Sequence, residues 1–152
     1  MTMPGERRSS KLDWFVAHPN FEVCSWRDPV IDSLGYDARH RYVETYWLPV
    51  LGPSAVLAVR RFAGLLDGHP TGVRVDLVEF GASLGIGAGT GRHTQINRTL
   101  NRLVEFHLAR ISGDDLEVHT TLPPLPLRLR RRLPLSVLDT LAEHERRGAR
   151  TA

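Results

Sequence analysis

A chain of 152 residues is about one domain long and can bury a hydrophobic core. With 41% hydrophobic and 24% charged residues it has the composition of a soluble globular protein, and no apolar run approaches the roughly 20 residues that span a bilayer. Cys24 is the only cysteine, which excludes an internal disulfide and a zinc site built from several thiolates. These features predict a cytoplasmic protein without membrane contact.

Charge is unevenly distributed along the chain. The net charge is +3, and Lys11 is the only lysine, so nearly all of the positive charge comes from arginine. Acidic and basic residues balance over residues 1–70, whereas residues 90–104 contain three arginines and no acid, and residues 128–132 contain four arginines. Basic clusters that follow a first half with equal numbers of acidic and basic residues indicate an anionic partner for the second half of the chain. The alternative is that the clusters are ordinary solvated surfaces.

The first third of the chain has few clear periodic patterns. Residues 1–11 are polar and lack the apolar stretch of a secretory signal, so we expect a flexible arm there. Residues 12–47 contain most of the aromatic residues, which predicts an extension that packs on the core or a dimer contact; a partner-binding surface is the alternative. Residues 37–47 are expected to form a short helix that ends before Pro49.

The rest of the chain has clearer signals for where helices and strands begin and end. Pro53 at a first helical position and Gly68 at the other end predict a central helix. Asp76 is a predicted N-cap. The elements expected after the central helix are a strand at 73–75, a helix at 77–84, a glycine-rich turn at 85–91, a helix at 93–107, a hairpin of strands 109–112 and 116–120, and a last helix that begins after Pro134.

This order of elements resembles the winged helix-turn-helix superfamily over residues 50–122. The superfamily has a small residue where two helices cross, an apolar residue before the turn, a turn glycine and an apolar residue that returns to the core. Gly81, Leu84, Gly85 and Ile86 match these positions. The resemblance implies a mainly α fold with a small β-hairpin wing (α+β), and a DNA-binding unit with N- and C-terminal helical extensions.

The expected division of the chain follows from this resemblance. It comprises a flexible arm at 1–11, an aromatic-rich extension at 12–47, a winged helix-turn-helix domain at 48–122, and a basic segment with a C-terminal helix at 123–152.

The helix expected at 93–107 has a face suited to reading DNA. Its inward residues leave Gln95, Arg98, Asn101 and Arg102 on the outward side, three or four positions apart. Arginine, glutamine and asparagine can make paired hydrogen bonds to base edges in the major groove. A merely solvated helix would more often have Glu and Lys there. We therefore predict a recognition helix.

Residues on either side of that helix complete the predicted interface. Arg92, His93 and Thr94 at its N-terminus are expected to anchor a DNA phosphate. The glycine-rich turn before them lacks the lysine and the preceding strand of a P-loop. Farther along, Arg128, Arg130 and Arg131 are expected either to contact the DNA backbone or to pair with acids of a partner subunit.

Two acids make the expected wing unusual. Asp114 and Asp115 lie at its tip, where phosphates would repel them, so we expect a short structural wing that stays off the DNA backbone.

No cofactor, metal or catalytic site is expected. His40 and Glu44 are one turn apart without an evident third ligand, and no nucleophile–base order or paired-carboxylate site is recognisable. The sequence therefore predicts a non-enzymatic, nucleoid-associated protein that binds double-stranded DNA, as a transcriptional regulator or an architectural factor, and that forms a homodimer. The alternative is a protein-interaction module on the winged scaffold that uses the aromatic extension.

Overall fold

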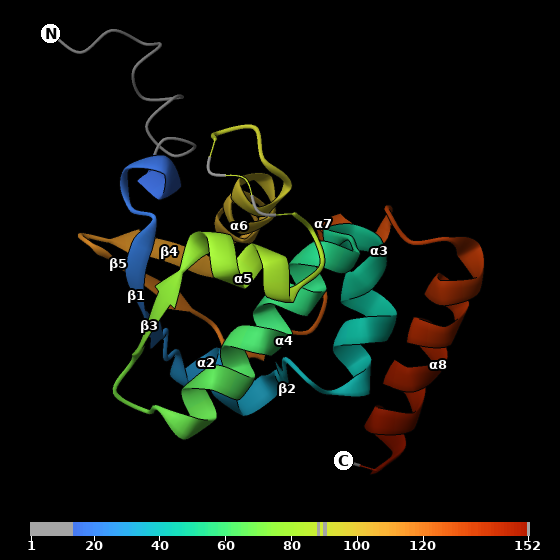
Figure 1. Ribbon diagram of the computed structural model, residues 1–152. Coiled ribbons are helices and arrows are strands. Elements are labelled where there is room, and N and C mark those ends of the chain that lie inside the picture. Colours follow the sequence, from blue (N-terminus) through green and yellow to red (C-terminus); the bar gives the residue numbers. More distant parts are fainter. Residues whose placement is uncertain (1–13, 88, 90, 152) are drawn as a thin grey trace, which may run out of the picture.

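The computed structural model describes residues 14–87, 89 and 91–151 of the chain; the arm expected at 1–11 lies outside them. The fold is α+β, with helices packed around a small sheet (Figure 1). Residues 14–17 form a helical turn. The elements that follow are β1 (Asn20–Ser25), α2 (Pro29–Leu34), β2 (Tyr36–Asp37), η1 (Val43–Trp47), α3 (Leu48–Leu51), α4 (Pro53–Gly68), β3 (Val73–Asp76), α5 (Leu77–Ser83), α6 (Gln95–Glu105), β4 (Ala109–Ser112), β5 (Asp115–Val118), β6 (Thr121–Leu122), α7 (Leu127–Arg130) and α8 (Leu135–Thr151).

Helix α4 is the central helix, and it begins and ends where the sequence predicts. Pro53 occupies its first turn after Gly52, whose φ of 84° suits a residue without a side chain. Its buried face contributes Val59, Phe62 and Ala63 to the core. The Phe62 ring stacks on Phe80 of α5 with the ring centroids 4.5 Å apart. These contacts join α4 to the pair of helices that follows it.

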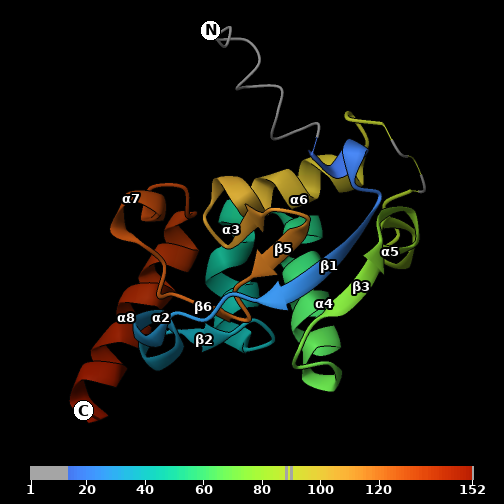
Figure 2. The same cartoon turned by 90° about the vertical axis from the view of Figure 1, so that its left-hand side faces the viewer.

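The main sheet contains a strand that the sequence analysis did not predict. Its order is β3-β1-β5-β4, with β1 antiparallel to β3 and parallel to β5. Phe21 and Val23 of β1 are fully buried, so the strand lies in the middle of the sheet with apolar side chains in the core (Figure 2). Part of the expected extension at 12–47 is therefore built into the sheet of the unit expected at 48–122.

The helix expected at 37–47 is placed differently. The chain forms the short strand β2, and then a π-helix, η1, that continues directly into α3. The backbone N–H of Leu48 donates to the carbonyl of Val43, five residues back. Pro49 lies just beyond, inside the continuous helical segment, where a proline ring clashes with the carbonyl four residues earlier. The wider turn accommodates this proline, so the helix does not end before it.

Most of the aromatic rings of residues 12–47 lie in the core. Phe15 and Phe21 are fully buried, and Tyr42, Tyr46 and Trp47 are at most 5% exposed. They belong to the same hydrophobic cluster as the buried face of α4. Burial of such large rings is a main source of stability in a chain of this size.

The rear half of the chain ends in a hairpin and two helices. Strands β4 and β5 pair through a two-residue turn in which Gly113 adopts a φ of 62°. Helix α8 begins after Pro134, as expected, and Leu141 anchors it to the core. Within the part of the chain that is described, no helix is both long enough and apolar enough to cross a membrane.

Candidate nucleic-acid interface

Helices α5 and α6 approach each other closely at Gly81. A Cβ atom at this position would lie 3.1 Å from Cβ of Ile96 on α6 and 3.1 Å from the carbonyl oxygen of Gly87 in the turn. Asp76 caps α5, as predicted, because its carboxylate accepts the backbone N–H of Glu79 at 3.0 Å. The pair of helices thus has the small residue at its crossing that the sequence indicated.

Helix α6 begins two residues later than expected. Its N-cap is Thr94, whose hydroxyl oxygen accepts the backbone N–H of Asn97. Arg92 and His93 therefore lie in the preceding turn, outside the helix. Arg92 is half-buried and takes part in interactions within the chain, and His93 is exposed. Of this group Thr94 is the residue that caps the helix.

The exposed surface of α6 is a narrow stripe of Gln95, Arg98 and Arg102, with Glu105 at its end. We call the first three residues the α6 stripe. Neither arginine makes an ion pair with any described residue, so both positive charges are uncompensated. The stripe borders an open hollow of about 470 Å³ that also contacts the start of α4.

Hydrogen bonds to backbone carbonyls hold the two arginines of the stripe. Arg98 donates from Nε and Nη2 to the carbonyl of His93, at 3.1 and 2.8 Å. Arg102 donates from Nη2 to the carbonyl of Val50 in α3, at 3.0 Å. A guanidinium group has five N–H donors, so each arginine keeps donors for a further acceptor.

The structure contradicts the prediction that Asn101 points outward. Asn101 is only 5% exposed and Asn97 is fully buried. The Nδ2 group of Asn101 donates to the backbone carbonyl of Asn97 at 2.9 Å and to its Oδ1 at 2.5 Å. Val104, one turn later, lines a hollow together with Trp14 from the N-terminal helical turn, which lies beside α6 in both views (Figures 1 and 2). The side of α6 that carries Asn97 and Asn101 is therefore buried, which the helical pattern alone did not predict.

A cation that the sequence analysis left out of the predicted site extends the α6 stripe. The guanidinium carbons of Arg102 and Arg132 lie 5.6 and 5.4 Å from the centroid of the Phe106 ring. The cation–π attraction to this one ring holds both arginines at the C-terminal end of α6. In the sequence, the only sign of this arrangement is Phe106, which directly follows the arginine-bearing helix. Its contact with Arg132, from the arginine run at 128–132, depends on the tertiary fold.

The arginines of α7 differ in their surroundings. Arg130 pairs with Glu145 of α8 at 2.5 Å, and the side chain is only 21% exposed. Arg130 therefore makes an ion pair within this chain, and its expected contact with DNA or with a partner subunit stays a prediction. Arg128 and Arg131 are exposed and have no ion pair among the described residues. They remain available to an external anion.

The hairpin tip is attached to the N-terminal helical turn. The indole Nε1 of Trp14 donates to the carbonyl of Gly113 at 3.1 Å, and His18 Nε2 lies 3.2 Å from the Asp114 carboxylate. The hairpin is short, as expected, and its two acids stay at the surface or near it.

Two titratable groups near the sheet are perturbed by burial. His119 is 2% exposed and stacks on Trp26, and burial lowers its pKa. Its Nδ1 donates to the carbonyl of Trp26 at 2.9 Å, because a carbonyl can only accept. Burial, and then the acids nearby, raise the pKa of the Cys24 thiol, which makes it a poor nucleophile at neutral pH.

The described residues contain no group of three His, Cys, Asp or Glu side chains that could hold a metal ion. Comparison with known proteins adds no further assignment: no protein-family model matches the chain, and neither a curated protein nor a solved structure matches it significantly.

Proposed function

We propose that this chain is a winged helix-turn-helix protein that binds double-stranded DNA and places α6 in the major groove. The observation that carries the proposal is the α6 stripe, an exposed row of one amide and two guanidinium groups whose charges no described acid neutralises. Side chains of these types are the ones that read guanine and adenine edges.

The order of elements supports the proposal. Helix α4, strand β3, helices α5 and α6 and the β4–β5 hairpin follow one another as they do in the winged helix-turn-helix superfamily, with Gly81 at the helix crossing. Two features depart from that pattern. Strand β1 separates β3 from β5, and the turn between α5 and α6 spans residues 84–94.

Charge at the C-terminal end of α6 extends the proposed surface. Arg132 shares the Phe106 ring with Arg102, and Arg128 of α7 and Arg131, directly after it, are exposed to solvent. An α-helix rises about 1.5 Å per residue, so the stripe from Gln95 to Arg102 extends roughly 10 Å along the helix, enough to meet more than one phosphate of a duplex. The acidic hairpin tip is expected to stay away from the DNA backbone.

The test is the salt dependence of DNA affinity. Arg98→Ala combined with Arg102→Ala removes two positive charges from the stripe, and Arg27→Ala combined with Arg74→Ala removes two exposed charges from the loop after β1 and from β3. Binding of a labelled mixed-sequence duplex of about 20 base pairs is followed by fluorescence anisotropy at several salt concentrations.

The stripe variant should bind weakly, and its slope of log affinity against log salt should fall by about 2. The control variant should keep the slope of the unmodified protein. Equal slopes in all three proteins, or no binding by the unmodified protein at low salt, would refute the proposal.

A regulator of transcription or an architectural factor, acting as a homodimer, is the biological role that we propose. A dimer would place two α6 helices on one duplex and double the contacts. Genome-wide immunoprecipitation distinguishes the two roles, since a regulator gives a discrete motif and an architectural factor gives broad coverage.

The second candidate is a protein-interaction module. It is favoured by the partly exposed Trp14 and Trp26, which line a hollow of about 450 Å³ beside β4, an edge strand of the sheet. An edge strand offers unpaired backbone groups to an extended peptide. A pull-down that survives nuclease treatment and is lost in Trp26→Ala supports this candidate over DNA binding.

A further inference from the structure

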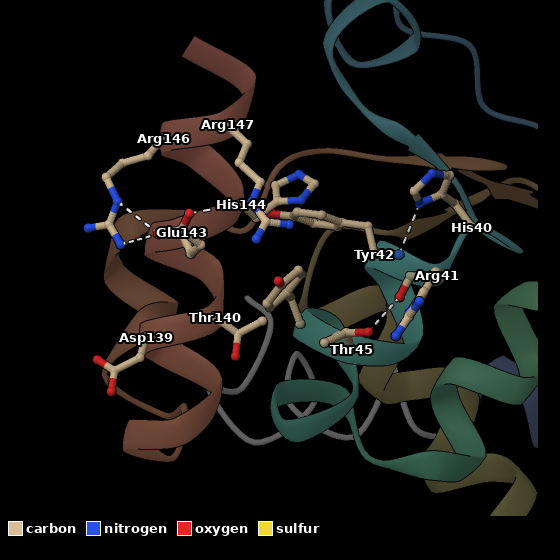
Figure 3. Close-up of a pocket in the computed structure, with 11 residues that line it drawn as sticks. His40, Arg41, Tyr42, Thr45, Asp139, Thr140, Glu143, His144, Arg146 and Arg147 are labelled. Atoms are coloured by element: carbon tan, nitrogen blue, oxygen red, sulfur yellow. Dashed lines mark hydrogen bonds and ion pairs between the residues drawn. The ribbon is translucent and has the colours of Figure 1, made fainter. Parts of the chain in front are cut away.

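The hollow beside the α6 stripe differs in charge from the largest hollow in the described part of the molecule. The largest one has a volume of about 690 Å³ and lies between residues 40–46 and α8 (Figure 3). There Glu143 engages Arg146 and Arg147, at 2.5 and 3.4 Å, and Asp139 adds a second carboxylate to the lining. The hollow beside the stripe has a volume of about 470 Å³, and the described residues that line it include no acid. An anion would meet no like charge in this lining.

Two guanidinium groups of α6 form one side of the smaller hollow. Arg98 and Arg102 are one helical turn apart, both are exposed, and neither makes an ion pair with a described residue. Their hydrogen bonds to the backbone carbonyls of His93 and Val50 hold them in place without neutralising their charge. Guanidinium groups with donors to spare are well suited to the oxygens of a phosphate.

A pair of hydroxyl groups lies next to the arginines. Ser54 in the first turn of α4 and Thr99 of α6 both line the hollow, and Thr99 Oγ1 donates to Ser54 Oγ at 3.0 Å. In this arrangement the hydroxyl hydrogen of Ser54 has no acceptor among the described residues, so it is free to donate to a ligand. Access is open, because a Cβ atom at the neighbouring Gly52 would meet nothing within 4 Å.

The backbone at the start of α4 adds donors to those of the side chains. No side chain caps this helix, and its first turn contains no acid. Pro53 has no N–H, and the N–H groups of Ser54 and Ala55 have no acceptor among the described residues. The start of a 16-residue helix also has a partial positive charge. These groups reinforce the attraction for an anion that the two arginines already provide.

We propose that this hollow seats one phosphate group, held by Arg98, Arg102 and Ser54. The oxygens of a tetrahedral phosphate can accept hydrogen bonds from both guanidinium groups and from the hydroxyl at the same time. The inference rests on the proposed function for the source of the phosphate, which is then the backbone of the duplex. A free phosphorylated compound has the same chemistry, so the experiment has one arm for each source.

The first arm contains no nucleic acid. Sodium phosphate is titrated into the ¹⁵N-labelled full-length protein, and sodium chloride keeps the ionic strength constant. In ¹H–¹⁵N spectra the backbone signals of Ser54 and Ala55 and the Nε–H signal of Arg98 should shift together and saturate, with a Kd below about 10 mM. The backbone signal of Thr71, in the turn after α4, should not move. Shifts that fail to saturate, or that chloride alone reproduces, would refute the seat.

Three substitutions test the location. Ser54→Asp places a carboxylate in the hollow and at a helix start, where a negative charge favours the helix, so this variant should fold. Ser54→Asn has almost the same shape without the charge. Thr71→Asp replaces an exposed hydroxyl by a carboxylate beyond the other end of α4. Ser54→Asp should weaken phosphate binding about tenfold, and the other two should stay within about twofold of the unmodified protein. Circular dichroism checks the fold of each variant.

The second arm uses the labelled duplex and fluorescence anisotropy. Ser54→Asp should weaken duplex binding about tenfold and lower the salt slope by about 1, because one phosphate contact is lost, whereas Thr71→Asp should keep the slope. If Ser54→Asp and Thr71→Asp bind the duplex equally well, the seat is refuted and DNA binding stands. If phosphate shifts the signals at the seat but the unmodified protein does not bind the duplex, the seat stands, its phosphate comes from a free compound, and the proposed DNA binding is refuted.

Discussion

The close approach of α5 and α6 at Gly81 gives a quantitative prediction, because the chain contains a matched control. Gly64 also lies inside a helix, α4, but a Cβ atom there would meet nothing within 4 Å. Replacing glycine by alanine inside a helix favours folding by about 0.5–1 kcal/mol through the backbone entropy of the unfolded chain. Gly64→Ala should therefore raise the free energy of unfolding by about that amount.

Gly81→Ala gains the same helix propensity and also meets steric resistance. Its new methyl group would lie 3.1 Å from Cβ and 3.3 Å from Cγ1 of Ile96, and 3.1 Å from the Gly87 carbonyl oxygen. Distances this short require the helices to move apart by a few tenths of an ångström, and overpacking of a core costs about 1–3 kcal/mol. The free energy of unfolding of Gly81→Ala should thus be about 1–3 kcal/mol below that of Gly64→Ala.

Urea unfolding followed by tryptophan fluorescence measures this difference. For a chain of this size each kcal/mol corresponds to about 2–4 °C in Tm, so thermal unfolding provides an independent check. The difference between the two variants isolates the packing cost, whatever the sign of either change alone. Two variants of equal stability would show that α6 is not packed tightly on Gly81.

Three further predictions concern other parts of the fold. Burial lowers the pKa of His119, so as the pH falls the unfolded chain binds a proton on this residue before the folded chain does. The stabilisation from neutral His119 should be fully present above the ordinary pKa of 6.5 and should be lost as the pH falls toward the folded pKa. His119→Asn should reduce this loss of stability, measured by urea unfolding at several pH values. A double-mutant cycle on Arg130→Ala and Glu145→Ala should give a coupling free energy of about 0.5–1 kcal/mol at low salt, since the pair is partly exposed, and a coupling of zero would contradict the paired geometry. The Cys24 thiol should react with iodoacetamide at pH 8 more slowly than free cysteine does, and an equal or faster rate would be inconsistent with its raised pKa.

The sequence predicted the elements whose signals are local. Helix α4 follows Pro53, Asp76 caps α5, and a turn at Gly113 closes the hairpin, although this turn has two residues and the predicted one had three, because β5 begins at Asp115. In each case the residues that determine the structure lie within a few positions of the element, and backbone preferences alone are sufficient.

Features that depend on distant contacts were not predictable in the same way. The partners of β1 lie about 50 and 90 residues farther along the chain, and nothing in its short apolar alternation indicates them. Asn101 is polar and lies next to residues of the exposed stripe, and its burial beside Asn97 depends on tertiary packing that the helical pattern does not specify. Likewise, the hollow beside α8 joins residues about 100 positions apart.

The central position of β1 determines how this protein can be divided. A fragment beginning at residue 48 would keep every element of the proposed DNA-binding unit, yet β3 and β5 would each lose the neighbour that covers their inner edges. Such a fragment should aggregate through these exposed strands rather than fold. A fragment expressed to study DNA binding therefore has to begin before Asn20. On the ribosome, too, β1 is made early and has to wait for residues 115–118 before the sheet can close, so folding is deferred until most of the chain has been synthesised.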